Sequence, residues 1–136
     1  MNRNAISMVV ALLCANALTT IHAAEKHNAL MVFTDAARSV YDICHANSVG
    51  DVRQGRACIA KEKDGVRLKF EAAQSVVSKN KVATGMLRDF YAFWRATFED
   101  IPARTDETKL LYDKRTWDAT AAINEKATRL ELELLP

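Results

Sequence analysis

The sequence has little proline and little glycine, with two Pro and four Gly in 136 residues. A β-sheet protein of this length needs many tight turns, so this scarcity argues against an all-β fold. The chain contains no internal repeat and no low-complexity tract. It also lacks a dominant charge, because 19 Lys and Arg nearly balance 17 Asp and Glu. Without a basic stripe, we expect no binding to nucleic acid.

Histidine is scarce as well, and none of the three follows His45. A haem held by Met31 on a first helix would therefore lack a histidine ligand on a last one. Cys44-His45 has the form of the end of a c-type haem motif, but Tyr41 occupies the place of the first cysteine. The Cys and His spacing matches no zinc pattern. Cys44 and His45 also point about 100° apart on a helix, which disfavours a nucleophile–base pair. The 17 acidic residues mark no pair as a glycosidase-like site. We expect no catalytic residue, no cofactor and no metal site.

The N-terminal segment is typical of a secretory signal peptide. Arg3 supplies a positive charge, residues 6–18 are almost wholly apolar, and Ala23 suits a signal peptidase. We predict that residues 1–23 are removed and that the remaining chain is periplasmic or secreted. The apolar run of 13 residues is shorter than the roughly 20 needed to span a bilayer, which disfavours a membrane anchor as the alternative to a signal peptide. The remaining chain has no long apolar helix, so no membrane attachment is expected after cleavage. Lipidation at Cys14 is disfavoured, because a bulky residue precedes it.

Residues 24–136 form a single expected domain of 113 residues, long enough to bury a core. Cleavage leaves two of the three cysteines, Cys44 and Cys58. An oxidising compartment favours a disulfide between them. The closed loop of 15 residues would stabilise the fold by about 3 kcal/mol in the chain-entropy model.

Apolar residues recur at intervals of three and four along most of residues 24–136, which predicts an all-α fold, a small bundle of about four helices with one disulfide. The expected helices cover residues 27–47, about 51–77, 82–99, and a last stretch that begins after Thr105 as N-cap. The expected core-facing positions are Leu30, Phe33, Ala37, Val40, Cys44, Val52, Ile59, Val66, Phe70, Ala73, Val77, Ala83, Leu87, Phe90, Trp94, Phe98, Ile101, Leu110, Trp117, Ala121, Ala127, Leu130 and Leu134.

Two local questions stay open in the sequence. The second helix either passes through Gly65 or turns there. Residues 130–134 alternate with a period of two, which permits a short strand, although helix is preferred.

Aromatic residues are most concentrated between Phe90 and Trp94. Tyr91 and Phe93 lie off the expected core stripe, so one of these rings is a candidate for protein binding beside Arg88 or Arg95. Residues 100–107 around Pro102 form a second candidate as a polar recognition loop, with the charged residues Asp100, Arg104, Asp106 and Glu107. Core packing for the aromatic residues and an ordinary surface loop are the competing interpretations.

One family resemblance gives a specific lead. Residues 41–48 (YDICHANS), 55–60 (GRACIA) and Asp64-Gly65-Val66 resemble the front half of the resistance-associated immunity proteins. Residues 82–87 and Ile101-Pro102 resemble that family's third helix and its end. The chain departs from the pattern at residues 61–63, where Lys-Glu-Lys replaces an aromatic–Ile element, and it lacks a later cysteine pair.

The resemblance implies a small periplasmic helical protein that neutralises a peptidoglycan amidase effector delivered by type VI secretion. Such an inhibitor needs a preorganised scaffold rather than catalytic residues. The alternative function is a small-ligand carrier or enzyme, with a cavity near Phe90, Trp94 and Trp117. The partner is expected to be a protein, and the sequence does not decide the oligomeric state.

Overall fold

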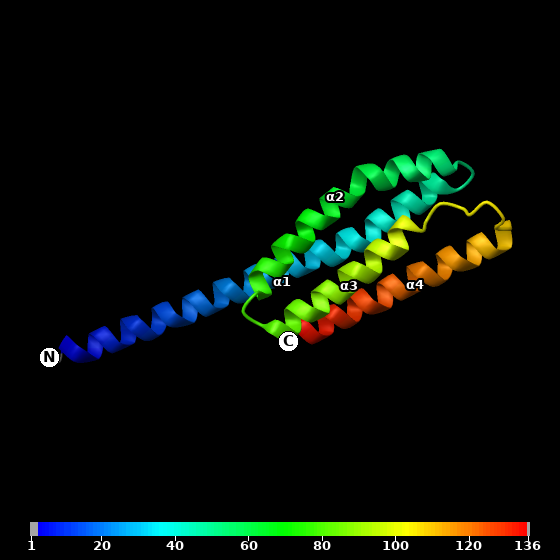
Figure 1. Cartoon of the computed structure of the whole chain (residues 1–136). Helices are drawn as coiled ribbons and strands as arrows, with labels where there is room; N and C mark the ends of the chain where they lie inside the picture. Colours follow the sequence, from blue (N-terminus) through cyan, green and yellow to red (C-terminus); the bar gives the residue numbers. More distant parts are fainter. Residues whose placement is uncertain (1–2, 136) are drawn as a thin grey trace.

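The computed structural model describes the backbone of residues 3–135 and the side chains of residues 19–135. It contains four helices, α1 (Arg3–Ser48), α2 (Val52–Val77), α3 (Lys81–Glu99) and α4 (Lys109–Leu134). Each helix runs antiparallel to the one before it, and α4 returns to pack against α1, which closes a four-helix bundle (Figure 1). The predicted all-α fold is therefore confirmed, and no strand occurs within residues 3–135.

The first helix is longer than the predicted 27–47, because it continues upstream to Arg3. Its N-terminal part extends beyond the other three helices (Figure 1). Among the side chains that the structure describes, Leu30 is the first that is fully buried. The predicted signal peptide falls largely in this extension, with residues 1–2 outside the described chain. In the part of the chain that the structure describes, no helix is both long and apolar enough to cross a membrane.

The disulfide predicted between Cys44 and Cys58 is present and joins the end of α1 to the start of α2. The two Cα atoms are 5.4 Å apart, within the range that a disulfide spans. The turn between the helices uses Gly50, whose φ of +84° suits glycine. Asp51 then caps α2 by accepting hydrogen bonds from two backbone N–H groups.

The start of α2 lies unusually close to the end of α1. A Cβ atom at Gly55 would meet the Ser48 Cβ at 2.6 Å, so only glycine fits there without a shift. The helix then continues through Gly65 without a turn, which settles the first open question. It buries Ile59, Val66 and Phe70 as predicted.

The core is built around α3. Asn80 caps this helix, and its stripe of Ala83, Leu87, Phe90, Trp94 and Phe98 is buried as predicted. The Trp94 indole N–H donates a hydrogen bond of 2.8 Å to the Ala37 carbonyl, so its one polar atom is satisfied inside the core. Tyr41, not included among the expected core positions, is also buried, and this burial raises its pKa to about 12.

The last helix differs from the prediction in two ways. Its N-cap is Thr108 rather than Thr105, because residues 100–108 form a longer loop. Its buried face is also rotated, since Leu110, Trp117 and Ala121 are exposed. The positions buried instead in the first half of the helix are Tyr112, Thr116 and Ile123. Ala127, Leu130 and Leu134 are buried as expected, and residues 130–134 are helical up to Leu134.

A polar contact joins α4 to α1 near the far end of the bundle. Glu131 accepts hydrogen bonds of 2.5 Å from the Thr34 hydroxyl and 2.7 Å from Arg38. Burial acts against the charged carboxylate, but these hydrogen bonds hold the pKa of Glu131 below its ordinary value. The α1–α4 pairing is therefore fixed by a charged hydrogen-bond network as well as by apolar packing.

Candidate functional site

The five predicted partner-binding residues do not form one surface. Tyr91 faces α2, where its ring stacks on Phe70 at a centroid distance of 4.3 Å. The ring is half-buried, and this burial raises the pKa of Tyr91. Tyr91 therefore contributes mainly to packing between α2 and α3.

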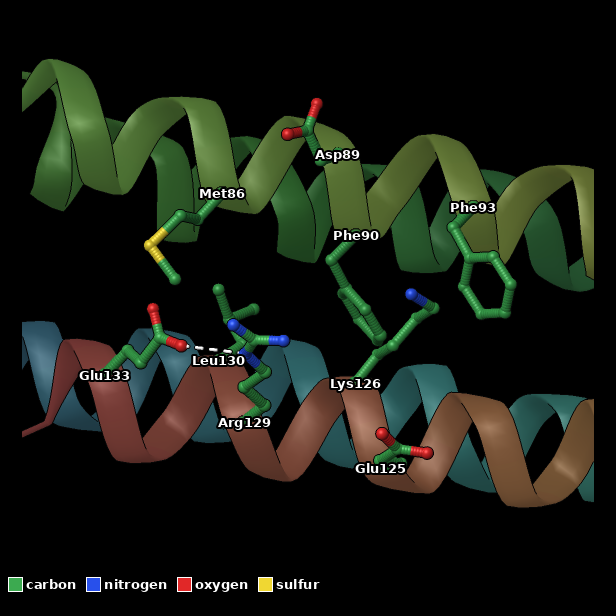
Figure 2. Close-up of a pocket in the computed structure, with 9 residues that line it drawn as sticks. All are labelled: Met86, Asp89, Phe90, Phe93, Glu125, Lys126, Arg129, Leu130 and Glu133. Carbon is green, nitrogen blue, oxygen red and sulfur yellow. Dashed lines mark hydrogen bonds and ion pairs between the residues drawn. The ribbon is translucent and has the colours of Figure 1, made fainter.

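Phe93 lies on the other side of α3, in a surface groove between α3 and α4 (Figure 2). The Lys126 ammonium group sits 4.9 Å from the centre of the Phe93 ring, a cation–π distance. The groove has a volume of about 370 Å³ and an apolar floor with charged side chains around it. It is lined by Met86, Asp89, Phe90, Phe93, Glu125, Lys126, Arg129, Leu130 and Glu133.

Asp100 and Arg104 do come together, in the loop of residues 100–108 between α3 and α4. An Arg104 guanidinium nitrogen lies 2.7 Å from an Asp100 carboxylate oxygen. Arg95 is separate from this pair, on the exposed side of α3, where it lies 3.9 Å from Glu99. Of the two predicted sites, only the loop site brings its residues, Asp100 and Arg104, into contact. The aromatic site does not, because Tyr91 and Phe93 lie on different sides of α3.

Arg115, which no sequence pattern marks as a site residue, holds this loop in place. Its guanidinium donates two hydrogen bonds to Glu107, at 2.7 and 2.6 Å. It also donates to the backbone carbonyls of Asp100 and Pro102. The hydrogen bonds from Arg115 hold the pKa of Glu107 at about 2. The beginning and the end of the loop are therefore both fixed to the first half of α4 by the Arg115 side chain.

A cleft separates this loop from the first half of α2, with a volume of about 480 Å³. We call it the cationic cleft, because three of its side chains are basic and one is acidic. Its lining residues are Arg56, Ile59, Ala60, Lys63, Glu99, Pro102, Ala103, Arg104 and Thr105.

The outer surface of α4 carries an apolar strip whose residues the helical spacing predicts to be in the core. Leu110, Trp117 and Ala121 are spaced by seven and four residues and share one face. Trp117 is 76% exposed and Leu110 is 78% exposed. We call these three residues the α4 strip. Large apolar side chains exposed together are typical of interaction surfaces.

The cavity expected near Phe90, Trp94 and Trp117 does not form from these residues. Trp94 is completely buried, whereas Trp117 is on the outer surface. Within residues 19–135, no group of three or more His, Cys, Asp or Glu side chains is arranged to hold a metal ion.

Comparison with known proteins adds no relative: no family model, no curated protein and no solved structure matches this chain.

Proposed function

We propose that this chain is an exported protein-binding module that uses the α4 strip as its main contact surface. The observation that carries this proposal is the exposure of Trp117, a large apolar residue that is 76% exposed. Burying such a side chain in a partner's pocket removes a large apolar area from water. Tryptophan is among the residues that most often dominate the free energy of protein association.

The scaffold beneath the strip supports the same proposal. Tyr112, Thr116 and Ile123 are buried in the bundle, so α4 presents Trp117 from a packed helix rather than from a loop. A surface that is already ordered loses less conformational entropy when it binds. The Cys44–Cys58 disulfide is in keeping with a protein that works outside the cytoplasm.

In its most specific form, we propose that the partner is a peptidoglycan amidase and that the chain is an immunity-type inhibitor. This part of the proposal depends on the resemblance of residues 41–66 to the resistance-associated immunity proteins. Inhibition of this kind requires the module to cover the amidase cleft, and it requires no chemistry from the module itself.

Capture experiments with matched variants test the binding surface. The full chain, expressed with its own N-terminal segment, is immobilised and exposed to extracts of its host, and captured proteins are quantified. Trp117→Ala should reduce capture of the specific partner by about 30-fold, the effect of losing a hot spot of 2 kcal/mol. Leu132→Ala is the control, because Leu132 is equally exposed, at 76%, near the other end of α4.

Two outcomes would contradict the proposal. Equal capture by the wild-type chain and Trp117→Ala would remove the α4 strip as the binding surface. For the inhibitor form, the captured protein is added to purified peptidoglycan. Release of peptides that is not slowed by the wild-type chain would overturn the amidase assignment.

The groove between α3 and α4 favours a second candidate function, the carriage of a small ligand. Its volume of about 370 Å³ lies in the range of small-molecule sites, and Phe90 and Phe93 provide apolar surface (Figure 2). An amphipathic ligand would suit this groove, because Lys126 and Arg129 lie at its edge. Mass spectrometry of the small molecules released when the purified protein is denatured would detect such a ligand. The Phe93→Ala variant should no longer retain that ligand through purification.

A further inference from the structure

The cationic cleft has the composition of a binding site for carboxylates. Arg56 and Lys63 project from α2 on one side, and Arg104 lies on the opposite wall in the α3–α4 loop. Ile59, Pro102 and Ala103 provide apolar surface between them. A cleft of about 480 Å³ is large enough for two or three side chains of an extended segment.

The charges around the cleft leave its cations in surplus. Glu99 is the only acid that lines it, and Glu99 has its own partner in Arg95 at 3.9 Å. Asp100 pairs with Arg104 at 2.7 Å and more distantly with Arg115 at 3.4 Å. The surplus of positive charge is therefore carried by Arg56 and Lys63. Within residues 19–135, no carboxylate lies within 4.0 Å of Arg56 or of Lys63.

The loop wall of the cleft is held in position before any ligand arrives. Asp100 fixes the Arg104 guanidinium at 2.7 Å, and the Arg104 backbone N–H donates to Glu107 at 3.2 Å. Arg115 fixes both of these acids to α4. Arg104 still has guanidinium N–H groups free to bind an anion, since guanidinium carries five donors in all. An ordered cation loses less entropy on binding a carboxylate than a mobile one.

From this arrangement we infer that the cationic cleft binds an acidic segment of the protein partner. The inference rests on the proposed function in one respect, that the chain has a protein partner. The cleft would then select partners by charge and increase the rate of association, while the α4 strip supplies apolar contact. Neutral partners of similar shape would bind more slowly and more weakly.

A peptide titration tests the inference without the partner. Capped hexaglutamate is added to the oxidised, isotope-labelled full chain, and backbone amide shifts are recorded by NMR. Shifts should cluster at residues 56–63 and 103–105, with little change for capped hexaglutamine. Binding should weaken as salt rises from about 50 to about 300 mM, because the charges involved are exposed to solvent.

Matched charge reversals locate the site. The double variant Arg56→Glu/Lys63→Glu should weaken hexaglutamate binding at least about fivefold. Lys79→Glu/Lys81→Glu is the control, because it makes the same change in net charge at two exposed lysines around the α2–α3 turn. This control should weaken binding less than about twofold. Arg104→Ala is a third variant, and because Arg104 lies in the α3–α4 loop, any loss of binding cannot come from a disturbed α2. Circular dichroism checks that all variants stay helical.

Three outcomes would overturn the inference. The first is equal weakening by both double variants, and the second is shifts spread over all basic surfaces. The third is binding of free glutamate as tightly as hexaglutamate, which would reassign the cleft to a small carboxylate. The test is independent of Trp117, so a chain that captures no protein can still bind the peptide. A chain that captures a partner but binds no peptide would disprove only the role of the cleft.

Discussion

Two connections lie at the same end of the bundle and are closed in different ways (Figure 1). The short turn between α1 and α2 is closed covalently by Cys44 and Cys58. The longer loop between α3 and α4 is closed by the ion pairs of Arg115. A covalent link constrains the unfolded chain and is insensitive to salt and pH, whereas ion pairs act only in the folded chain and depend on both. The first connection therefore contributes stability, and the second can contribute a surface that responds to its surroundings.

Removing the disulfide should have the largest effect. Reduction should lower the free energy of unfolding by about 3 kcal/mol, because the unfolded chain regains the entropy lost in a 15-residue loop. Urea denaturation with and without reductant measures the change. Cys44→Ala/Cys58→Ala should show the same loss without reductant and no further loss with it. Equal stability of oxidised and reduced protein would show that the turn needs no covalent closure.

The close approach of Gly55 to Ser48 at the α1–α2 turn predicts the second largest loss of stability. Gly55→Ala should cost about 2 kcal/mol, because the added Cβ meets Ser48 and the helices must shift. Gly65→Ala is the matched control on the same helix, since nothing lies within 4 Å of a Cβ there. The control should stabilise the protein by about 0.5 kcal/mol through its better helix propensity. Thermal melts of both variants, with Ser48→Gly/Gly55→Ala as a rescue, measure these differences.

Breaking the ion pairs of the second connection should have a smaller effect on the whole bundle. Arg115→Ala should lower the free energy of unfolding by about 1.5 kcal/mol, because two charged hydrogen bonds and two bonds to loop carbonyls are lost. The larger change should be local, with faster amide hydrogen exchange in residues 100–108. Exchange that stays unchanged there would mean that Arg115 does not hold the loop. Arg129→Ala is the control, since Arg129 forms an exposed pair with Glu133 on the same helix.

Lowering the pH should weaken the Arg115-closed loop and leave the disulfide-closed turn unaffected, so acid distinguishes the two connections without mutation. The pKa of Glu107 is about 2 in the folded chain, below its ordinary value of 4.5, so its charge favours folding at neutral pH. That contribution should be complete above pH 4.5 and should be lost as the pH falls towards 2. Melting curves of wild type and Glu107→Gln should converge over this range. Cys44→Ala/Cys58→Ala should keep the acid dependence of the wild type.

Much of the fold could be predicted from the sequence, because three helices bury the stripes that their spacing indicates. The exception is α4, whose sequence carries two competing stripes. Leu110 and Trp117 are more apolar than Tyr112 and Thr116, so hydrophobicity alone favours the wrong face. A straight helix cannot bury Trp117 together with Leu130 in one stripe, because thirteen residues place them about 140° apart. Tyr112, Thr116 and Ile123 lie in line with Ala127, and the Thr116 hydroxyl donates to the Tyr112 carbonyl, which permits its burial.

The candidate site was less accessible to prediction than the fold. Asp100 and Arg104 could be proposed as a pair, because they are close in sequence and polar. Arg115 could not, because it contacts loop residues 8 to 15 positions earlier in the chain. Arg56 could not, because it lines a cleft opposite residues 102–105, which are 46 to 49 positions later. Separating Tyr91 from Phe93 needed the positions of the neighbouring helices, since both rings lie beside the same core stripe.

The two tryptophans give this protein a pair of internal optical reporters. Trp94 is enclosed and hydrogen-bonded, so its fluorescence should be blue-shifted and protected from acrylamide. Trp117 is in solvent, so its emission should be red-shifted and readily quenched. A chain keeping only Trp94 would report loss of the packed interior, and a chain keeping only Trp117 would report when α4 is covered. Folding and complex formation could thus be followed separately, without an added dye.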